Sequence, residues 1–480
     1  MNRKMILHIL GKMMGVEGLL LLIPAFVGLI YQEKCAVYFV ITAAVLAVIF
    51  LLTGRKKPEN TMLYGKDGLL IVSSAWILWS LFGALPFFLS GSIPNYMDAF
   101  FETVSGFTTT GSTILKNVEV LPQCMTFWRS LTHWVGGMGV LVFVMVLTNL
   151  GKQSAIHLMR AEVPGPEKDK LVPKSRTTAQ ILYGMYFILT AIQVVLLLLG
   201  GMNLFDSLIH AFGTAGTGGF SNYADSVGHF DSAYLDGVIT VFMILFGINF
   251  NLYFFLAIRE FKLVFKNEEL RAYLIIIAGA ILMIMANIYP IYGSVGEAFR
   301  YSAFQVASII TTTGYATADY MLWPQFSRCV LAALMIIGAC ASSTGGGIKV
   351  SRLLISLKSI YKEIKQMLHP KSVNVVKLNK KKLGEDTIRN VYVYLLAYIT
   401  LAIVSVLIVS LDNFDFETTV GSVITALGNV GPGLGMTGPV GSFADYSLLA
   451  KFVFCLDMLA GRLEIFPFLM LFSYVWRKKF

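Results

Sequence analysis

The segment Asp98-Ala-Phe-Phe-Glu-Thr-Val-Ser-Gly-Phe-Thr-Thr-Thr-Gly-Ser-Thr113 decides how the rest of this sequence is interpreted. It lies between two long apolar runs, so we expect it at a membrane face or inside the bilayer. Its amphipathic part, Met97 to Phe107, is followed by small hydroxyl residues and a glycine. A short helix followed by a Thr/Gly strand can aim backbone carbonyl groups at a dehydrated cation. One copy alone would be a weak indication, because Thr and Gly are also common where membrane helices pack.

The composition around this segment is that of a polytopic membrane protein. Of the 480 residues, 56% are apolar and 14% are charged. Several stretches of about 20 apolar residues are long enough to cross a bilayer as helices. These runs do not alternate as the strands of a membrane β-barrel would. We therefore expect an all-α polytopic membrane protein with about ten transmembrane helices.

The charges indicate how the chain is oriented. The formal net charge is +10, and the Lys and Arg clusters fall on alternate connections between the apolar runs. Cytoplasmic connections collect basic residues, so both termini are expected in the cytoplasm and the chain in a lipid membrane rather than on nucleic acid. The N-terminal run lacks a small-residue cleavage site and is expected to be a retained helix. The five cysteines are scattered without CxxC spacing, which favours packing roles over ligands or disulfides.

The outward-facing connections repeat the pattern of the first. Each begins with an acidic residue, continues for two to four helical turns and ends in a small or polar pair before a glycine; the four run over residues 98–113, 206–222, 297–316 and 417–433. The final glycines are Gly111, Gly219, Gly314 and Gly431, which are 108, 95 and 117 residues apart. An acidic residue is favourable at a helix start. The repeat predicts four helix–pore-loop–helix units.

These units define the expected domain organisation. An N-terminal helix pair (1–60) precedes pore unit 1 (61–176), pore unit 2 (177–268), pore unit 3 (269–383) and pore unit 4 (384–480). Four units around a pseudo-fourfold axis would form a pore whose wall, at one level, is a ring of loop carbonyls. Non-helical backbone is tolerated at membrane depth where it lines such a cavity. The alternative is that the four glycines only allow close packing in extracytoplasmic loops. Four copies at matching places argue against this interpretation.

Six motifs together resemble a known family. They are Gly106-Phe-Thr-Thr-Thr-Gly111, Thr217-Gly-Gly-Phe-Ser221, Thr311-Thr-Thr-Gly-Tyr315, Gly428-Asn-Val-Gly-Pro-Gly-Leu-Gly435, Ser343-Thr-Gly-Gly-Gly-Ile-Lys349 and Gly461-Arg-Leu-Glu464. The chain resembles the Trk/Ktr/HKT superfamily of potassium transporters, and most closely its bacterial TrkH/TrkG branch. The resemblance covers nearly the whole chain. It implies a bacterial cytoplasmic (inner) membrane protein that forms a homodimer above a ring of cytosolic Rossmann-type regulatory subunits of the RCK/KTN class (TrkA-like).

The resemblance also implies a selectivity filter with bound K⁺. Carried over position by position, the filter residues are Thr109, Thr110, Gly111, Gly218, Gly219, Thr312, Thr313, Gly314, Asn429, Val430 and Gly431. In the family, serine at the first glycine position accompanies sodium permeation, so glycine here favours potassium. The sequence is looser than a true potassium-channel filter, and we expect weaker selectivity, with some passage of rubidium and sodium.

A second glycine-rich segment, residues 338–349, interrupts what should be the inner helix of pore unit 3. Consecutive glycines in a helix interior cost about 1 kcal/mol each against alanine. The resemblance implies an intramembrane gate loop beneath the filter that swings aside on activation. A flexible kink without a gating role is the alternative. A phosphate-binding loop is excluded, because GxxxxGK[ST] and a preceding strand are both missing.

The predicted gate residues are Gly345, Gly346, Gly347, Lys349 and Arg462. Arg462 lies inside the last apolar run, and an intramembrane arginine by default faces a cavity or a partner. The resemblance implies a position in the pore beside the gate loop; the alternative is a structural ion pair with Asp457 or with another helix. Lys349 either lines the cytoplasmic vestibule or marks the membrane face.

Two transport functions remain open at this point. The first is channel-like potassium uptake, with outward acidic residues concentrating cations at the entrance and the basic stretch Tyr361–Lys382 docking the regulatory ring. The second is a symporter that couples potassium to protons or sodium, for which Asp457 and Glu464 are the candidate carboxylates. No catalytic constellation occurs, so an enzyme is not expected. No covalent cofactor is expected; a nucleotide, ATP/ADP or NAD(H), is expected on the partner rather than on this chain.

Overall fold

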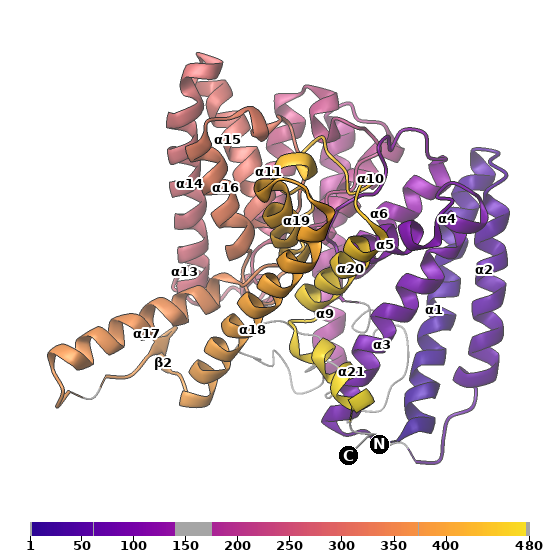
Figure 1. Ribbon diagram of the computed structural model, residues 1–480, viewed down its shortest axis with the longest axis horizontal. Helices are drawn as coiled ribbons and strands as arrows, with labels where there is room; N and C mark the ends of the chain where they lie inside the picture. Colours follow the sequence, from indigo (N-terminus) through magenta and orange to yellow (C-terminus); the bar gives the residue numbers. More distant parts are fainter. Residues whose placement is uncertain (1, 61, 140–174, 373, 477–480) are drawn as a thin grey trace.

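The computed structural model describes residues 2–60, 62–139, 175–372 and 374–476 (Figure 1). Over these residues the chain is helical apart from a small antiparallel pair of strands, β1 (Lys377–Leu378) and β2 (Lys381–Lys382). The prediction of an all-α membrane fold is confirmed. Residues 140–174, the last part of predicted pore unit 1, lie outside the described residues.

An N-terminal helix pair precedes the repeats. It consists of α1 (Arg3–Ile30) and α2 (Ala36–Ile49), the latter continued by a π-helical turn over Phe50–Gly54. One side of α2 exposes a row of large apolar side chains: Val37, Val40, Ile41, Val45, Val48, Leu51 and Leu52. Such a row would be unfavourable in water, and lipid is its natural environment.

Each of the four units then contains a long first helix, a short pore helix and a second helix. The long first helices are α3 (Gly65–Gly83, extended by α4, Leu85–Leu89), α9 (Ser175–Leu199), α14 (Glu268–Tyr292) and α18 (Glu385–Val409). The pore helices are α5 (Tyr96–Phe107), α10 (Leu204–Gly216), α15 (Val295–Ile310) and α19 (Phe416–Gly428), in the upper half of Figure 1. The second helices are α6 (Gln123–Gly137), α11 (Ala233–Phe246) with α12 (Phe250–Ala257), α16 (Gln325–Ile337) and α20 (Leu448–Arg462).

The acidic residues of the repeat mark the starts of the pore helices, as expected. Asp98, Asp206, Glu297 and Glu417 each lie in the first turn of their pore helix. Three of these helices also have a side-chain cap from the preceding residue, namely Asn95, Asn203 and Asp415. Caps and first-turn carboxylates satisfy the free amides at a helix start.

As far as the structure describes them, the second helices are shorter than a bilayer span. In the described part of the chain, six helices are long and apolar enough to cross a membrane, or seven if the bent pair α11–α12 counts as one. The second helices α6, α16 and α20 have only 15, 13 and 15 residues, and α11 meets α12 at 93°. The sequence predicts about ten spans and does not reveal the short lengths of α16 and α20 or the bend between α11 and α12.

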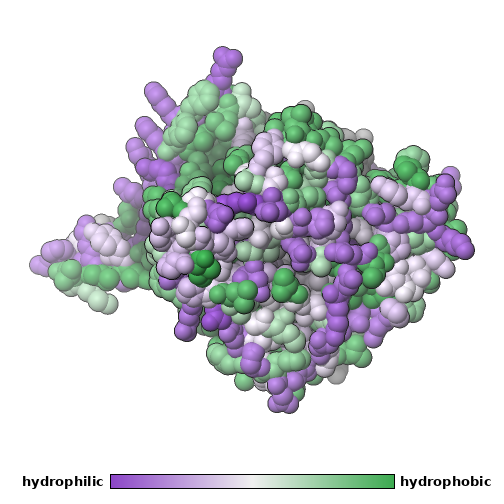
Figure 2. All heavy atoms as spheres, turned by 90° about the horizontal axis from the view of Figure 1, so that it is seen from above, coloured by the Kyte–Doolittle hydropathy of each residue, from purple (hydrophilic) through white to green (hydrophobic). Residues whose placement is uncertain are grey.

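Beyond the repeats, one helix leaves the body of the protein. Helix α17 (Val350–Leu368) projects to the left in Figures 1 and 2, followed by the β1–β2 pair, while α13 (Phe261–Phe265) and α21 (Phe466–Trp476) lie close to the body. The exposed apolar residues of α17 include Leu357, Ile360, Tyr361, Ile364, Met367 and Leu368. Helix α21 lies at the lower end of Figure 1, where α1 also begins.

Candidate ion-conduction site

The four pore helices end in the same turn. In each, the residue before the filter glycine donates its N–H to the carbonyl five residues back: Thr110 to Ser105 (2.9 Å), Gly218 to Gly213 (2.8 Å), Thr313 to Ser308 (2.8 Å) and Val430 to Thr425 (3.0 Å). The residue before that donates to the carbonyl three back, at 3.0–3.3 Å. These two bonds define a Schellman motif, which closes a helix C-terminus and turns the chain sharply. The sequence repeat therefore encodes one local structure four times.

The backbone of this turn has positive φ at two places in every unit. The first is Thr109, Thr217, Thr312 or Asn429, at φ 54–58°. The second is the filter glycine, at 85°, 76°, 83° and 106° for Gly111, Gly219, Gly314 and Gly431. A β-branched residue is an outlier at positive φ, and such strain persists only where the surroundings enforce it. Between them, these two positions redirect the carbonyl groups of the loop.

The four turns meet in a closed ring. A Cβ atom added to Gly111 would lie 1.9 Å from the carbonyl oxygen of Gly218, in the next unit. The same relation continues around the ring: Gly219 to Thr313 O (2.0 Å), Gly314 to Val430 O (2.3 Å), and Gly431 back to Thr110 O (2.7 Å). No side chain fits at these positions. The predicted filter residues of the four units are thus brought together, and each glycine abuts a backbone carbonyl of its neighbour.

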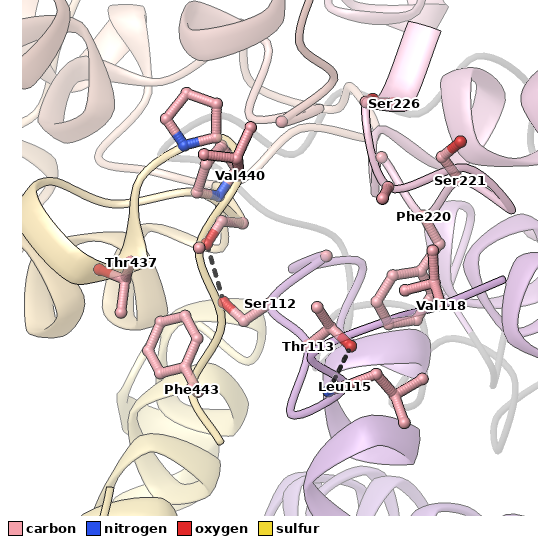
Figure 3. Close-up of a pocket in the computed structure, with 18 of the residues that line it drawn as sticks. Ser112, Thr113, Leu115, Val118, Phe220, Ser221, Ser226, Thr437, Val440 and Phe443 are labelled. Atoms are coloured by element: carbon pink, nitrogen blue, oxygen red, sulfur yellow. Dashed lines mark hydrogen bonds between the residues drawn. The ribbon is translucent and has the colours of Figure 1, made fainter. Parts of the chain in front are cut away.

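Side chains also join unit 1 to unit 4 across this ring. Ser112 Oγ donates to Gly431 O at 2.9 Å (Figure 3). Asn429 Nδ2 donates to Thr110 Oγ1, also at 2.9 Å. Units 1 and 4 are the first and last in the sequence, so these bonds close the circle between the chain's most distant repeats. Two tyrosines of unit 3 make similar links to its neighbours: Tyr315 donates to His210 O in unit 2, and Tyr320 donates to Gly433 O in unit 4.

The ring opens into a chamber lined by all four filter glycines. This cavity of about 100 Å³ lies among the loops that follow the pore helices, including Ser112, Thr113, Phe220 and Ser221 (Figure 3). The pore helices end at the ring with their C-termini, where the helix dipole carries partial negative charge. Four such ends and a ring of carbonyl oxygens form a site suited to a desolvated monovalent cation.

A buried ion pair behind the ring is a feature that sequence reasoning missed. Glu102 and Arg129 are 0% and 2% exposed at their side chains, and Arg129 Nε donates to Glu102 Oε1 at 2.8 Å. Glu102 also accepts from Thr113 Oγ1 and from the N–H of Ile114, while Arg129 Nη1 donates to Ser221 O at 3.1 Å. The pair therefore connects the loop of unit 1 with the loop of unit 2.

Several of the outward acidic residues that were expected to concentrate cations have basic partners in the structure. Glu102 is neutralised inside the protein, and other outward carboxylates also have basic partners: Asp98 with Lys451, Asp236 with Arg300, Glu417 with Arg328 and Asp445 with Lys116. Asp206 accepts from Asn203, Asn222 and Tyr223, so it serves as an anchor for its own loop. Burial, and then the Asp206 carboxylate, raise the pKa of Tyr223, which keeps its phenol a neutral donor.

Replacing Glu102 with glutamine is expected to destabilise the protein and lower its transport rate. The change leaves Arg129 buried without a counter-charge, and breaking a buried pair in this way costs about 3–5 kcal/mol. The readouts are the temperature at which the purified protein aggregates and uptake in cells. Glu417→Gln is the matched control, because its pair with Arg328 is 26% and 44% exposed and surface pairs contribute about 0–1 kcal/mol. Equal behaviour of the two variants would contradict the anchoring role.

The glycine-rich segment 338–349 packs directly against the filter turns. A Cβ atom on Gly345 would lie 2.8 Å from Thr311 O, and one on Gly346 would lie 2.4 Å from Gly428 O. The N–H of Gly346 donates to Thr312 Oγ1 at 2.6 Å, and that of Gly347 to Gly428 O at 2.9 Å. The loop therefore occupies the space beneath the ring, between units 3 and 4. A longer side chain at these glycines would not fit against the backbone of the turns.

Both ends of this loop are held by buried groups. Glu269, at the start of α14, accepts from the N–H of Ala341 at 2.7 Å and from that of Ser351 at 3.1 Å. Lys349 is 2% exposed, and its Nζ donates to the carbonyl of Gly345. Lys349 is therefore folded into the loop and does not mark the membrane face. Sequence reasoning missed Glu269, because its role depends on backbone amides about 70 to 80 residues away.

Arg462 lies beside the loop and joins it to unit 1. Its Nη1 donates to Thr344 O at 2.6 Å, and its Nη2 donates to the carbonyls of Gly136 and Gly137 at 2.5 and 2.6 Å. The guanidinium thus links the ends of two second helices through the loop. Asp457, the proposed structural partner, bonds instead to Ser405 Oγ at 2.7 Å. The alternative of an Arg462–Asp457 ion pair is not what the structure contains.

The two carboxylates considered for ion coupling, those of Glu464 and Asp457, each interact with another side chain through one oxygen. Glu464 pairs with Arg352 at 2.6 Å, and Arg352 also lies over the ring of Tyr394. Asp457 is 1% exposed and lies between α20 and α18, bonded to Ser405. Neither carboxylate lines the chamber at the filter.

The chain is similar to known proteins over nearly its whole length. Residues 36–478 match the family described as "TrkH: Cation transport protein". The chain is 35% identical over 490 residues to the Trk system potassium uptake protein TrkH of Escherichia coli K12, covering all of both chains, and 33% identical to TrkG of that strain, covering 99% of each. The crystal structure of the potassium transporter TrkH from Vibrio parahaemolyticus is similar, with a TM-score of 0.87, 33% identity and 98% of each chain covered.

Proposed function

Because the chain belongs to the TrkH family of cation transport proteins, we propose that it takes up potassium ions across the bacterial cytoplasmic membrane. It is a multi-pass membrane protein and a transport protein, not an enzyme. The observation that carries the proposal is the closed ring in which each filter glycine abuts the carbonyl of the next unit. The relatives named for potassium uptake support the choice of ion.

The ring supplies the chemistry that a desolvated ion needs. The carbonyl oxygens of Thr110, Gly218, Thr313 and Val430 would replace part of the water shell of a potassium ion. Their positions are set by Schellman turns and by contacts with neighbouring units, so the groups are already oriented when the ion arrives. The helix C-termini add negative partial charge without a carboxylate that would bind the ion too tightly.

Conduction would be controlled by the glycine-rich loop that lies beneath the ring. Gly345, Gly346 and Gly347 pack against the filter turns, and Arg462 holds the loop with a positive charge near the path. The positive charge opposes cations and the loop blocks their way; opening requires the loop to leave the turns of units 3 and 4. The predicted cytosolic regulatory ring, with its nucleotide, would act on this equilibrium through α17 and the basic strand pair beside it. A homodimer and cytoplasmic termini are parts of the same proposal.

The alternative, a symporter coupled to protons or sodium, requires a titratable or second ion site on the path. Neither candidate carboxylate lines the chamber beside the filter glycines, and each is engaged by another side chain, Glu464 by Arg352 and Asp457 by Ser405. This arrangement favours passage down the electrochemical gradient.

The two mechanisms differ in the reversal potential of the purified protein in a planar bilayer. For channel-like uptake, the reversal potential should follow the potassium gradient alone and stay unchanged when a pH gradient is imposed. A shift with the proton or sodium gradient at fixed potassium would support coupling and contradict this mechanism. Protein that carries Gly111→Ala in the proposed filter serves as the control for leak currents.

A further inference from the structure

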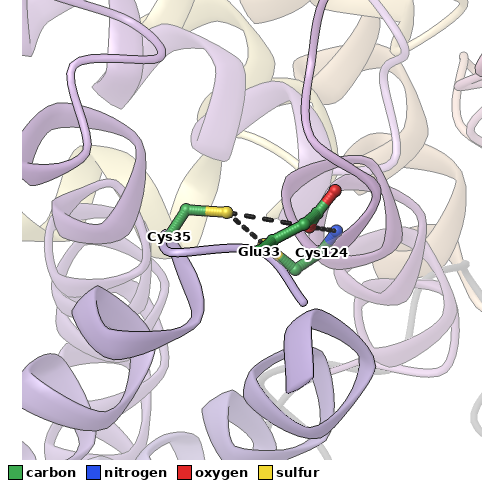
Figure 4. Close-up of side chains that lie close together, drawn as sticks. All are labelled: Glu33, Cys35 and Cys124. Atoms are coloured by element: carbon green, nitrogen blue, oxygen red, sulfur yellow. Dashed lines mark hydrogen bonds between the residues drawn. The ribbon is translucent and has the colours of Figure 1, made fainter. Parts of the chain in front are cut away.

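Two cysteines that are far apart in the sequence meet at one end of the N-terminal helix pair. Cys35 immediately precedes α2 and Cys124 lies in the first turn of α6, and their sulfur atoms are 2.8 Å apart (Figure 4). Their separation of 89 residues gives no hint of this contact in the sequence. Cys124 is fully buried, while Cys35 is partly exposed. The sequence predicts packing roles for all five cysteines and does not reveal this contact; both thiols are free in the structure.

The surrounding structure holds the two sulfur atoms together. A Cβ atom on Gly28 of α1 would lie 2.8 Å from the Cβ of Ala36 and 3.1 Å from the Cβ of Cys124, so three helices touch here. The Glu33 carboxylate caps α6, accepting from the N–H of Gln123 at 2.6 Å and from that of Cys124 at 2.9 Å. The cap and the tight packing leave the thiols little freedom to separate.

We propose that Cys35 and Cys124 are the site of an extracytoplasmic disulfide that ties the N-terminal helix pair to α6. A disulfide requires two sulfur atoms about 2.0 Å apart, and the present contact is 2.8 Å. The inference rests on the proposed membrane orientation, which places this end outside the cytoplasm, where disulfides form and persist. It does not depend on which ion is carried.

The chemistry needs an oxidant, which we identify by class as an extracytoplasmic thiol–disulfide oxidoreductase. The more accessible Cys35 thiolate attacks the disulfide of the oxidoreductase and forms a mixed disulfide, releasing one oxidoreductase thiolate. Cys124 thiolate then attacks the Cys35 sulfur, which forms the Cys35–Cys124 bond and releases the second thiolate. The two cysteines lose two protons and two electrons, and the oxidoreductase gains both.

A metal ion is the competing occupant, since Glu33, Cys35 and Cys124 form a possible ligand group. Two thiolates on one tetrahedral zinc ion are about 3.8 Å apart, given Zn–S bonds of about 2.3 Å, so the sulfur atoms would have to move away from each other. Both Glu33 oxygens are also already used by backbone amides. The structure therefore favours the bond over the ion.

Counting free thiols tests the proposal. Cells are quenched in acid, and the full-length protein is denatured and labelled with a maleimide carrying a polyethylene glycol chain, with and without prior reduction. The chain has five cysteines, so a disulfide predicts three labels before reduction and five after it. Cys35→Ser should give four labels in both samples. The matched control Cys329→Ser, which removes an exposed cysteine elsewhere, should give two labels before reduction and four after it.

Five labels in unreduced wild-type protein would overturn the proposal, and zinc retained by the native protein together with five labels would assign a metal site instead. The orientation is tested separately with Gly91→Cys in a background in which all five native cysteines, including the exposed Cys329, are replaced by serine. Gly91 lies in an open loop on the same predicted side, so a membrane-impermeant maleimide should label it in right-side-out vesicles. Labelling only in inverted vesicles would overturn the orientation and this inference. It would not contradict the proposal that the ring of filter glycines and carbonyls binds the ion.

Discussion

Replacing Gly111 with alanine is expected to lower potassium uptake to about one hundredth of the wild-type rate or less, which corresponds to a rise of about 2.7 kcal/mol in the barrier for ion passage. The reason is geometric. A Cβ atom at Gly111 would lie 1.9 Å from Gly218 O at a backbone φ of 85°. Either the turn or the neighbouring carbonyl must move, and both belong to the ring that would bind the ion. Gly111→Ser adds a hydroxyl at the same place and should change the ion preference as well.

The measurement is uptake by a bacterial strain that lacks other potassium uptake, with rubidium or potassium as the tracer. Gly91→Ala is the matched control, because Gly91 also has a positive φ, 73°, but no atom within 4 Å of an added Cβ. It should keep near wild-type uptake, with a small loss of stability of about 1 kcal/mol. Normal uptake and unchanged ion preference in folded Gly111→Ala and Gly111→Ser protein would show that the ring does not select the ion.

Replacing Arg462 with alanine should have the opposite effect and raise basal flux in the absence of the regulatory partner. The guanidinium donates to Thr344 of the loop and to Gly136 and Gly137 of α6. A hydrogen bond to a charged group contributes about 1.5–3 kcal/mol, so losing one shifts the closed-to-open ratio by about ten- to hundredfold. Removing the positive charge also lowers the electrostatic barrier to a cation on the path.

Flux into proteoliposomes containing only this chain is the appropriate readout. Arg462→Lys keeps the positive charge but loses the forked hydrogen bonds of the guanidinium. A flux between those of wild type and Arg462→Ala would therefore separate the effect of the charge from that of the hydrogen bonds. Arg328→Ala removes an arginine whose partner Glu417 lies at the start of a pore helix, at the end away from the ring, and should leave basal flux unchanged. Shortening the loop by one of Gly345–Gly347 should raise basal flux independently. Folded variants that stay as closed as wild type would contradict a blocking role for the loop.

Much of the geometry of the proposed filter could be predicted from the sequence because it is local. An acidic residue, a short amphipathic helix and a small residue before glycine specify a helix that ends in a Schellman turn, using only residues within five positions of each other. Four copies imply four equivalent turns. The positions of Gly111, Gly219, Gly314 and Gly431, and the all-α class, therefore follow from the amino-acid sequence alone.

The tertiary structure alone decided what surrounds these turns. The sequence predicts a surface acid at Glu102, yet this residue is buried against Arg129, because the helix that carries Arg129 packs behind the ring. Glu269 holds a loop that begins some 70 residues later, and Cys35 meets Cys124 across 89 residues. The physical reason is the same in each case. A helix turn depends on hydrogen bonds between near neighbours in the chain. A charge pair, a thiol contact or the position of a glycine-rich loop depends instead on which distant helices are in contact.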